Sequence, residues 1–172
     1  MSKFDKAYKF TSAREGGVAN VKGDRGGYTA YGISSKYHPE FFEGVKDIHD
    51  EEEMRPKVKD FYLKNYWNAL RCDELPLVHG VWLHDVGVNS GRTGIRHFQE
   101  ACETAQDGVI GNNTISAANA IPAEVINDRM VQIRSAFYRR LADQKDQEKF
   151  LRGWLNRASL CHDYCADLLD NQ

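Results

Sequence analysis

Residues 15–33 read EGGVANVKGDRGGYTAYGI and form the most unusual segment of the chain. Five glycines precede Gly32, and apolar residues do not recur at helical spacing, so we expect a glycine-rich turn or small β-hairpin here. The residues before this segment predict a first helix over residues 4–14, with apolar side chains at roughly helical spacing: Phe4, Ala7, Tyr8 and Ala13. Glu15 then ends this helix and lies directly before two glycines.

Helical patterns resume at Asp50 and continue to the end of the chain. Glu53 follows Asp50 in the spacing of a capping box, although Pro56 lies deep for a helix that begins there. Further helices are predicted over residues 75–88, 95–105 and 122–142, and two short helices are expected after them. Strand-like alternation is nearly absent, so the sequence predicts a mainly α fold with a small hairpin region after the first helix.

Two smaller features are expected to be structural. The segment Asp107–Gly111 reads as a turn between helices, with Asn112 or Asn113 capping the helix that follows. Trp82 and Trp154 lie on apolar faces and are expected in the core.

The composition excludes several classes of protein. With 23 basic and 25 acidic residues the formal net charge is −2, whereas a protein that binds duplex nucleic acid usually has a strong basic excess. No apolar run approaches the roughly 20 residues that a membrane span needs, so no membrane insertion is expected. The first residues, MSKFDKAYKF, lack the apolar core of a signal peptide. We therefore expect synthesis in the cytoplasm without a signal peptide.

Cysteine and histidine give no sign of a metal site or of a cysteine nucleophile. The four cysteines are expected to be buried thiols rather than a disulfide framework. The sequence has no His-Glu-x-x-His motif, and His79 and His84 are five positions apart, off a shared helical face. Neither a metal nor another cofactor is predicted.

The chemistry is predicted in the glycine-rich segment. If it folds back as a hairpin, Glu15, Asp24 and Thr29 can face one groove, and two carboxylates flanking a groove are what glycosidic bond cleavage requires. Each residue also has a structural interpretation. Glu15 is compatible with a solvated position at a helix end, Asp24 before Arg-Gly-Gly with a turn, and Thr29 and Tyr31 with ordinary hairpin positions.

These motifs resemble a known enzyme family. Glu15-Gly16-Gly17, Asn20, Asp24-Arg25-Gly26-Gly27-Tyr28-Thr29 and Tyr31-Gly32-Ile33-Ser34 are similar, in order and spacing, to the start of glycoside hydrolase family 108. Tyr66-Trp67 also resembles a motif of that family. Val18 departs from the pattern, because the family usually has an aromatic residue at this position, and this departure removes one expected site of sugar stacking.

The second half resembles the predicted peptidoglycan-binding domain that follows family 108 modules. The motifs that carry this resemblance are Asp85-Val86-Gly87-Val88-Asn89-Ser90-Gly91, Gln99, Asp107-Gly108-Val109-Ile110-Gly111 with Thr114, and Gly153-Trp154-Leu155-Asn156-Arg157. The resemblance implies a lysozyme-like catalytic module over residues 1–92 and a helical module over residues 93–172. No flexible linker separates them, so one compact unit is expected.

The resemblance implies an N-acetylmuramidase that cleaves peptidoglycan between N-acetylmuramic acid and N-acetylglucosamine. Glu15 is then the general acid, Asp24 acts on water, and Thr29 holds that water. An inverting reaction requires the two carboxyl groups to lie roughly 6.5–9.5 Å apart. The residues expected to contact substrate are Asn20, Tyr31, Tyr66, Trp67, Asn89 and Gln99, with buried polar bracing as the alternative for the last two.

Two other functions stay open at this point. A lytic transglycosylase also uses one glutamate and needs no second carboxylate, and a non-catalytic wall-binding or secretion-assisting protein could share the fold. Members of the family occur as phage or prophage endolysins, and some are labelled secretion activators. An endolysin of this kind implies a holin that lets it reach the wall from the periplasmic side, and a monomer is expected.

Overall fold

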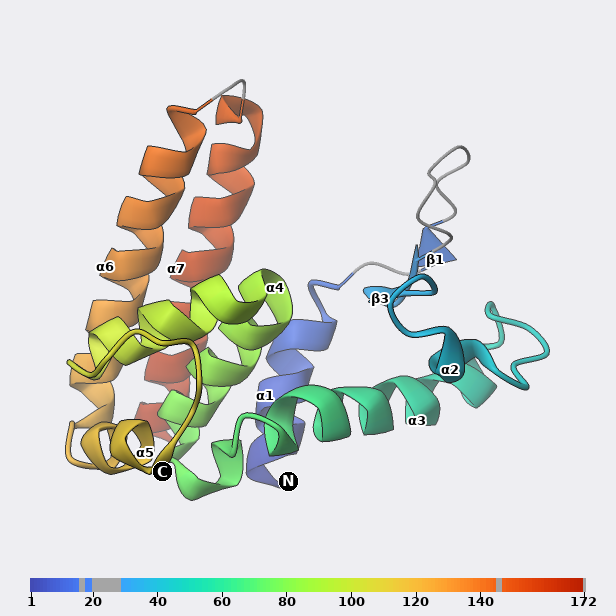
Figure 1. Ribbon diagram of the computed structural model, residues 1–172, viewed down its shortest axis with the longest axis horizontal. Helices are drawn as coiled ribbons and strands as arrows, with labels where there is room; N and C mark the ends of the chain where they lie inside the picture. The colour runs from blue at the N-terminus through green and yellow to red at the C-terminus, as the bar shows by residue number, and fades with distance from the viewer. Residues whose placement is uncertain (16–17, 20–28, 145–146, 172) are drawn as a thin grey trace.

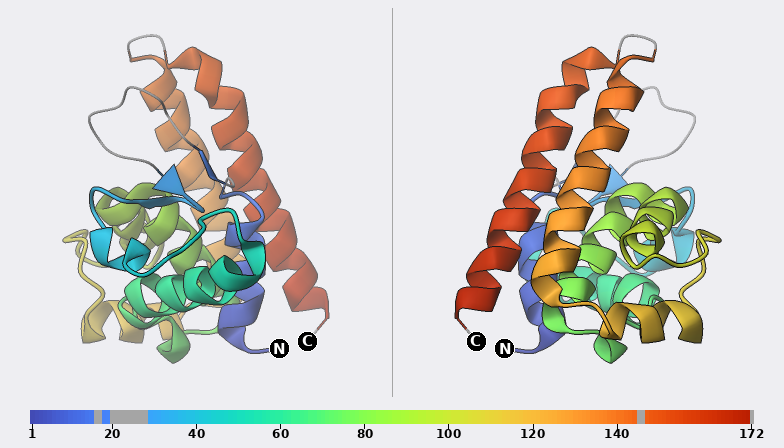
Figure 2. Two further views of the ribbon diagram at one scale, coloured as in Figure 1. Left: turned by 90° about the vertical axis from the view of Figure 1, so that its right-hand side faces the viewer. Right: turned by 90° about the vertical axis from the view of Figure 1, so that its left-hand side faces the viewer.

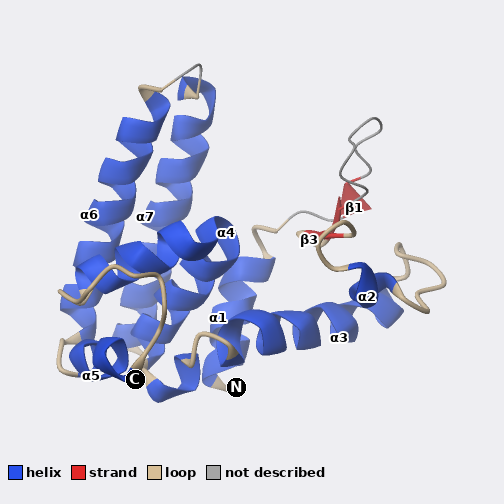
Figure 3. Ribbon diagram, viewed as in Figure 1, coloured by secondary structure: helices blue, strands red, loops and turns tan. Residues whose placement is uncertain are grey.

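A computed structural model describes residues 1–15, 18–19, 29–144 and 147–171. Its described part is mainly helical, as expected for a lysozyme-like helical fold, with one small sheet (Figure 3). Asn20 and Asp24, both predicted site residues, lie outside the described residues. No helix in the described ranges combines the length and the apolar character that crossing a membrane requires.

The first helix, α1 (Lys3–Ser12), sets the position of the glycine-rich segment. Ser2 caps it: the Ser2 hydroxyl accepts from the Asp5 N–H at 3.0 Å, and the Asp5 carboxylate accepts from the Ser2 N–H at 2.9 Å. The buried face consists of Phe4, Ala7, Phe10 and Thr11. The helix ends two residues earlier than predicted, so Glu15 follows it in a short turn, with its N–H bonded to the Thr11 carbonyl at 3.2 Å.

Three short strands follow α1. They are β1 (Val18–Ala19), β2 (Thr29–Ala30) and β3 (Ile33–Ser34), paired antiparallel in the order β1-β2-β3. Thr29 pairs with Ala19 on one side and with Ser34 on the other. A hairpin region after the first helix was predicted, and this sheet confirms it. The short helix α2 (Pro39–Phe42) comes next.

The helix α3 (Glu51–Tyr62) begins where the sequence predicted. The Asp50 carboxylate accepts from the N–H groups of Glu52 and Glu53 at 3.0 and 3.2 Å. Pro56 lies inside the helix, and the strong cap and the buried Met54 and Val58 retain the helical geometry around it. A π-helical turn (Leu63–Asn68) and a 3-10 turn (Cys72–Glu74) then lead into the next helix.

The longest helix, α4 (Leu77–Ala101), lies in the middle of the molecule and packs against α1, α6 and α7 (Figure 1). The sequence predicted two helices here, and the backbone does break at Gly91, which has φ of +52°. A side chain on Gly94 would collide with the carbonyl oxygen of Val86, so the two segments approach each other closely at this break. Asn89 lies two residues before this break.

The last three helices are α5 (Asn112–Asn119), α6 (Ala123–Ala142) and α7 (Glu148–Asp170). The predicted helix over residues 122–142 is confirmed as α6, but the expectation of two short helices after it was wrong, because α7 is continuous. The buried residues Ala158, Cys161 and Cys165 follow one another at helical spacing, so a single face of α7 packs along its length without a break. Gly111 rather than Asn112 or Asn113 occupies the N-cap of α5.

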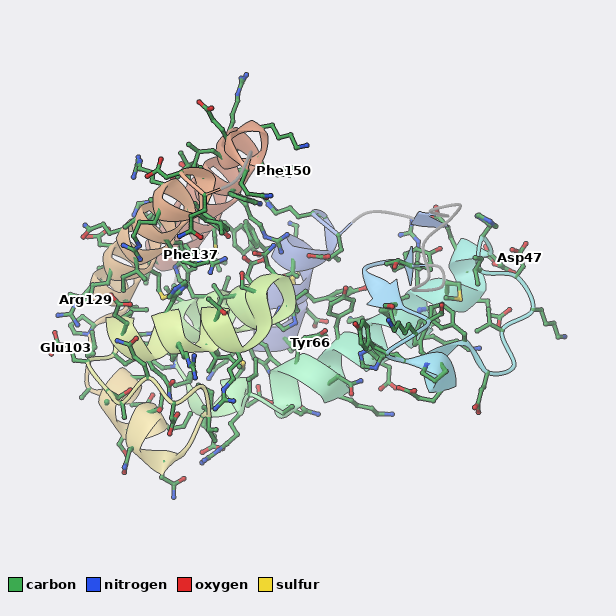
Figure 4. The ribbon with its side chains drawn as sticks, turned by 45° about the horizontal axis from the view of Figure 1, so that its top comes forward. Asp47, Tyr66, Glu103, Arg129, Phe137 and Phe150 are labelled. Carbon is green, nitrogen blue, oxygen red and sulfur yellow. The ribbon has the colours of Figure 1, made fainter. Side chains whose placement is uncertain are left out.

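Helices α6 and α7 form an antiparallel hairpin that projects beyond the other helices, and both chain termini lie at the opposite end of the molecule (Figure 2). At the base of the hairpin Arg129 pairs with Glu103 at 2.7 Å (Figure 4). One apolar core extends from α1 to α7, and Trp82 belongs to it as predicted. Trp154 is only partly buried, contrary to expectation. All four cysteines are buried free thiols, as predicted.

Candidate active site

The carboxylate of Glu15 lies at the end of α1, in contact with residues from both ends of the chain. Its Oε1 atom accepts a hydrogen bond of 3.0 Å from Nη2 of Arg157, which projects from α7. The Glu15 side chain is 20% exposed and that of Arg157 is 15% exposed. Glu15 is therefore largely shielded yet open to solvent on one side, which is the situation a catalytic carboxyl group requires.

Arg157 is shared between two carboxylates. Its Nη2 and Nε atoms donate to Asp85 of α4 at 2.8 and 3.3 Å, and the Asp85 side chain is only 5% exposed. Burial alone would lower the pKa of Arg157, but the charges of and hydrogen bonds to Asp85 and Glu15 outweigh it, and the pKa is raised. Arg157 is therefore a permanent cation with one deeply buried and one partly exposed partner.

A second layer fixes Asp85. The hydroxyl of Thr11 in α1 lies 3.3 Å from Oδ1 of Asp85 and 3.2 Å from Nδ1 of His84. His84 is fully buried, and desolvation lowers its pKa to about 4, partly opposed by the charge of Asp85. His84 is therefore neutral near pH 7 and adds no positive charge beside Arg157 and Asp85.

Two tyrosines lie on the other side of Glu15. Tyr62 and Tyr66 stack with ring centroids 5.5 Å apart, and the Tyr62 hydroxyl donates to the carbonyl of Tyr31 at 2.9 Å. Burial raises the pKa of both phenols, and the negative charge of Glu15 raises them further. Figure 4 shows Tyr66 where the end of α3 meets α1. Tyr66 was predicted from the sequence as a substrate contact, whereas Tyr62 was not predicted as a site residue.

A tight turn between β2 and β3 approaches the Glu15 carboxylate. Tyr31 and Gly32 both have positive φ, +53° and +77°. A β-carbon on Gly32 would lie 2.7 Å from the Tyr62 hydroxyl and 2.8 Å from Oε2 of Glu15. Only glycine both adopts this backbone conformation readily and leaves room for the two groups. The Tyr-Gly pair after Thr29 therefore places bare backbone against the Glu15 carboxylate.

The other predicted site residues do not all gather at Glu15. Thr29 is half-buried in β2, and the Tyr31 side chain faces a separate pocket beside Arg55. Trp67 is fully buried between Phe4 and His84 and offers no face to a ligand.

Asn89 and Gln99, which the sequence predicted as a pair, lie in different networks. Oδ1 of Asn89 accepts hydrogen bonds from Arg134, Tyr138 and Ser90 at 3.1, 3.2 and 2.9 Å. Gln99 is buried, and its amide holds the loop after α4 through Asp107, Gly108 and Val109 at 2.7, 2.7 and 3.0 Å. The structure therefore gives Gln99 the surroundings of a brace and leaves Asn89 exposed beside the active site.

The arrangement supplies a proton donor or acceptor in Glu15, a fixed cation in Arg157 and phenolic groups beside them. Within the described ranges, no three His, Cys, Asp or Glu side chains lie close enough together to hold a metal ion. Asp85 and Arg157 were quoted in the sequence only as parts of two motifs. Each is a charged residue inside a family motif for which the sequence offered no structural function. That was the signal that could have assigned the two residues to the site.

Comparisons with known proteins agree with this division of the site between two parts of the chain. The family described as Glycosyl hydrolase 108 matches residues 8–91, and the Predicted Peptidoglycan domain matches residues 93–159. SagA of Brucella abortus is a similar solved structure, with 29% sequence identity and a TM-score of 0.74, over 95% of this chain and 94% of that one. No curated protein sequence matches the chain.

Proposed function

We propose that this protein, whose residues 8–91 belong to the glycosyl hydrolase 108 family and whose residues 93–159 belong to the predicted peptidoglycan domain family, is an N-acetylmuramidase. The two families together support a peptidoglycan-acting glycoside hydrolase. The bond cleaved is the β-1,4 bond from N-acetylmuramic acid to N-acetylglucosamine. Glu15 protonates the leaving glycosidic oxygen, and water adds to the anomeric carbon of the muramic acid.

The observation that carries this proposal is the setting of Glu15. It is a partly exposed carboxyl group in the turn after α1, with the Tyr62 hydroxyl and the Gly32 backbone close to Oε2 and Arg157 bonded to Oε1. A general acid must be held in place and reachable by substrate at the same time. The Glu15 carboxyl group meets both requirements.

Arg157 and Asp85 take a defined part in the proposed mechanism. A lone arginine beside Glu15 would favour the ionised carboxylate and so oppose its function as an acid. Asp85 compensates the charge of Arg157 through two hydrogen bonds, and Glu15 is left as the partner that gains and loses a proton. Arg157 then stabilises the carboxylate that forms when the proton is transferred.

Asp24 and Thr29 complete the proposal for the attacking water. Asp24 lies outside the described residues, so its function as the base rests on the sequence motif alone. Thr29 is held in β2, four residues before the β3 position Ile33, and its hydroxyl is assigned to positioning the water. If Asp24 proves dispensable, the alternative of a lytic transglycosylase gains support. In that reaction a hydroxyl group of the substrate replaces water.

We extend the proposal to the setting in which the enzyme acts. Peptidoglycan lies outside the cytoplasmic membrane, so an enzyme made in the cytoplasm needs a passage to the periplasmic side. In lysis of a host cell by a phage or prophage, a holin would open that passage. A protein that assists secretion through the wall is the alternative setting for the same chemistry.

The test is the chemistry of the cleaved chain ends. Purified peptidoglycan is digested with the wild type and with Glu15→Gln, and the released fragments are analysed by mass spectrometry. Reducing muramic acid ends from the wild type alone support the muramidase. Anhydro-muramic ends instead identify a transglycosylase. If neither protein releases fragments, the enzymatic proposal fails, and a wall-binding or secretion-assisting protein remains.

A further inference from the structure

A pocket of about 310 Å³ is lined by Arg157 but not by its buried partner Asp85. It lies between the end of α1, the break in α4 and one face of α7, and its lining includes Arg14, Asn89, Gly153, Trp154, Asn156 and Arg157. The mechanism described above uses only Arg157 from this set. The pocket is therefore a second feature of the same cleft, next to the proposed general acid.

Hydrogen-bond donors line the wall of this pocket. Oδ1 of Asn89 is occupied by Arg134, Tyr138 and Ser90, which fixes the amide so that its N–H₂ group is directed away from them. Neither this N–H₂ group nor Nη1 of Arg157 has a hydrogen-bond partner among the residues that the structure describes. Both are free to donate to a ligand.

The charge around the pocket is positive. Arg14 and Arg157 line it, and Arg134 lies buried behind Asn89. In the described part of the chain, the hydrogen-bond partners of Arg134 are all neutral groups: His97, Asn89, Ser90 and Tyr138. Burial lowers the pKa of His97 to about 4, so its ring adds no charge near pH 7.

The two carboxylates near the pocket do not cancel this charge. Glu15 and Asp85 both pair with Arg157, which leaves Arg14 and Arg134 as cations without a carboxylate partner in the described ranges. When Glu15 is protonated for catalysis, three guanidinium groups face one carboxylate. A low-dielectric wall strengthens the attraction of such a site for an anion.

The remaining wall is aromatic and open. Trp154 stacks on Tyr138 with centroids 5.4 Å apart and is only partly buried, and a β-carbon on Gly153 would meet nothing within 4 Å. An extended chain can therefore pass along α7 with small apolar side chains against the indole. Short peptides that alternate alanine with carboxylate-bearing residues, such as the stem peptides of peptidoglycan, have this combination of chemistry.

We propose that the pocket between Arg14, Asn89 and Arg157 binds a free carboxylate of the stem peptide on the muramic acid next to the cleaved bond. The proposal rests on the proposed function and adds a specificity to it: the enzyme recognises peptide-bearing strands. It also gives α7 a direct function in substrate recognition, besides placing Arg157 beside Glu15.

The test uses Asn156, which is exposed at the edge of the pocket and has no part in the proposed chemistry. Asn156→Asp adds a negative charge in nearly the same shape, and Asn156→Lys adds a positive one. Each is assayed on native peptidoglycan and on peptidoglycan whose peptide carboxylates have been amidated. For native peptidoglycan, Asn156→Asp is expected to raise KM about tenfold, a size typical of one repulsive charge at short range in a partly shielded site, whereas Asn156→Lys leaves KM equal or lower.

On amidated peptidoglycan the KM of the wild type is expected to rise by the same factor of about ten. The KM of Asn156→Asp is expected to equal that of the wild type on this substrate. Equal KM values for native and amidated wall, or an Asn156→Asp effect that persists on amidated wall, would overturn the proposal. A binding measurement separates it from the proposed function: a soluble disaccharide-peptide and its amidated counterpart are titrated into the wild type. Tighter binding of the free acid supports the pocket even if no cleavage occurs, and equal binding contradicts it.

Discussion

Nη2 of Arg157 lies 3.0 Å from Oε1 of Glu15, although 142 positions separate the two residues in the chain. Glu15 falls within the match to the glycosyl hydrolase family and Arg157 within the match to the peptidoglycan domain. The candidate active site is therefore assembled from both parts. The second part supplies a group that contacts the proposed acid directly, besides any contact it makes with the wall.

Removing the guanidinium of Arg157 should lower the stability of the fold. Arg157→Gln leaves the buried Asp85 carboxylate without its charged partner, which is expected to destabilise the fold by about 3 kcal/mol. Urea denaturation measures this loss, and Arg152→Gln, an exposed position on the same helix, is the control. Adding Asp85→Asn to Arg157→Gln should recover part of the stability. If Arg157→Gln unfolds at the same urea concentration as the control, Arg157 is not a structural partner of Asp85.

Asp85→Asn should change the pH dependence of catalysis. With Asp85 neutral, the positive charge of Arg157 acts on Glu15 alone and favours its ionised form. Because a general acid works only in its protonated form, the high-pH arm of the kcat/KM profile is expected to move to lower pH. Asp128→Asn, an exposed change on α6, should leave the profile unchanged. A high-pH arm that stays in place or moves upward contradicts the charge sharing proposed for Arg157.

Two glycines with nearly equal backbone conformations test the turn at Glu15. Gly32 and Gly44 have φ of +77° and +73°, but only Gly32 has atoms within 4 Å of an added β-carbon. Alanine at either position should cost about 1 kcal/mol of stability through backbone strain. Gly32→Ala should in addition lower kcat at least tenfold, because the methyl group displaces the Glu15 carboxylate or the Tyr62 hydroxyl. Equal activity of the two variants would rule out a catalytic requirement for the close approach.

The buried His84 predicts a loss of stability in acid. Desolvation lowers its pKa in the folded state to about 4, against an ordinary value of 6.5. The unfolded chain binds the proton more readily than the folded protein does. The stability that comes from keeping His84 neutral is therefore fully present above about pH 6.5 and is lost as the pH falls toward 4. The total loss in the free energy of unfolding is about 3 kcal/mol. His84→Gln should therefore lose less stability than the wild type between pH 7 and pH 4.5, measured by urea denaturation. Parallel losses in both proteins would contradict this.

Much of the fold follows from local patterns in the sequence. Helical periodicity and the Asp50 cap predicted α1, α3 and α6, and the glycine-rich segment predicted the hairpin region. The errors have local causes. Two short helices were expected after α6, but Ala158, Cys161 and Cys165 keep one buried face along the single helix α7. Asparagine is a residue type that favours helix N-caps, which pointed to Asn112 or Asn113, yet Gly111 occupies the N-cap of α5.

The site was less predictable, because it depends on contacts between distant segments. The sequence identified Glu15 through its glycine neighbours and Tyr66 through its motif. The ion pairs with Arg157 could not be predicted from spacing, since α4 and α7 must pack before Asp85 and Arg157 meet. Trp67, predicted as a substrate contact, is buried, because the π-helical turn after α3 directs it into the core.

The central claim is that Glu15 is the general acid, and the most direct measurement is the turnover of purified peptidoglycan by Glu15→Gln beside an exposed control, Glu40→Gln. Both proteins are first matched for folding by their thermal unfolding. The account predicts a fall in kcat of roughly 10²–10⁴-fold for Glu15→Gln, the usual contribution of a positioned acid, and an unchanged kcat for Glu40→Gln. A folded Glu15→Gln protein that keeps more than about a third of the wild-type rate would contradict the account.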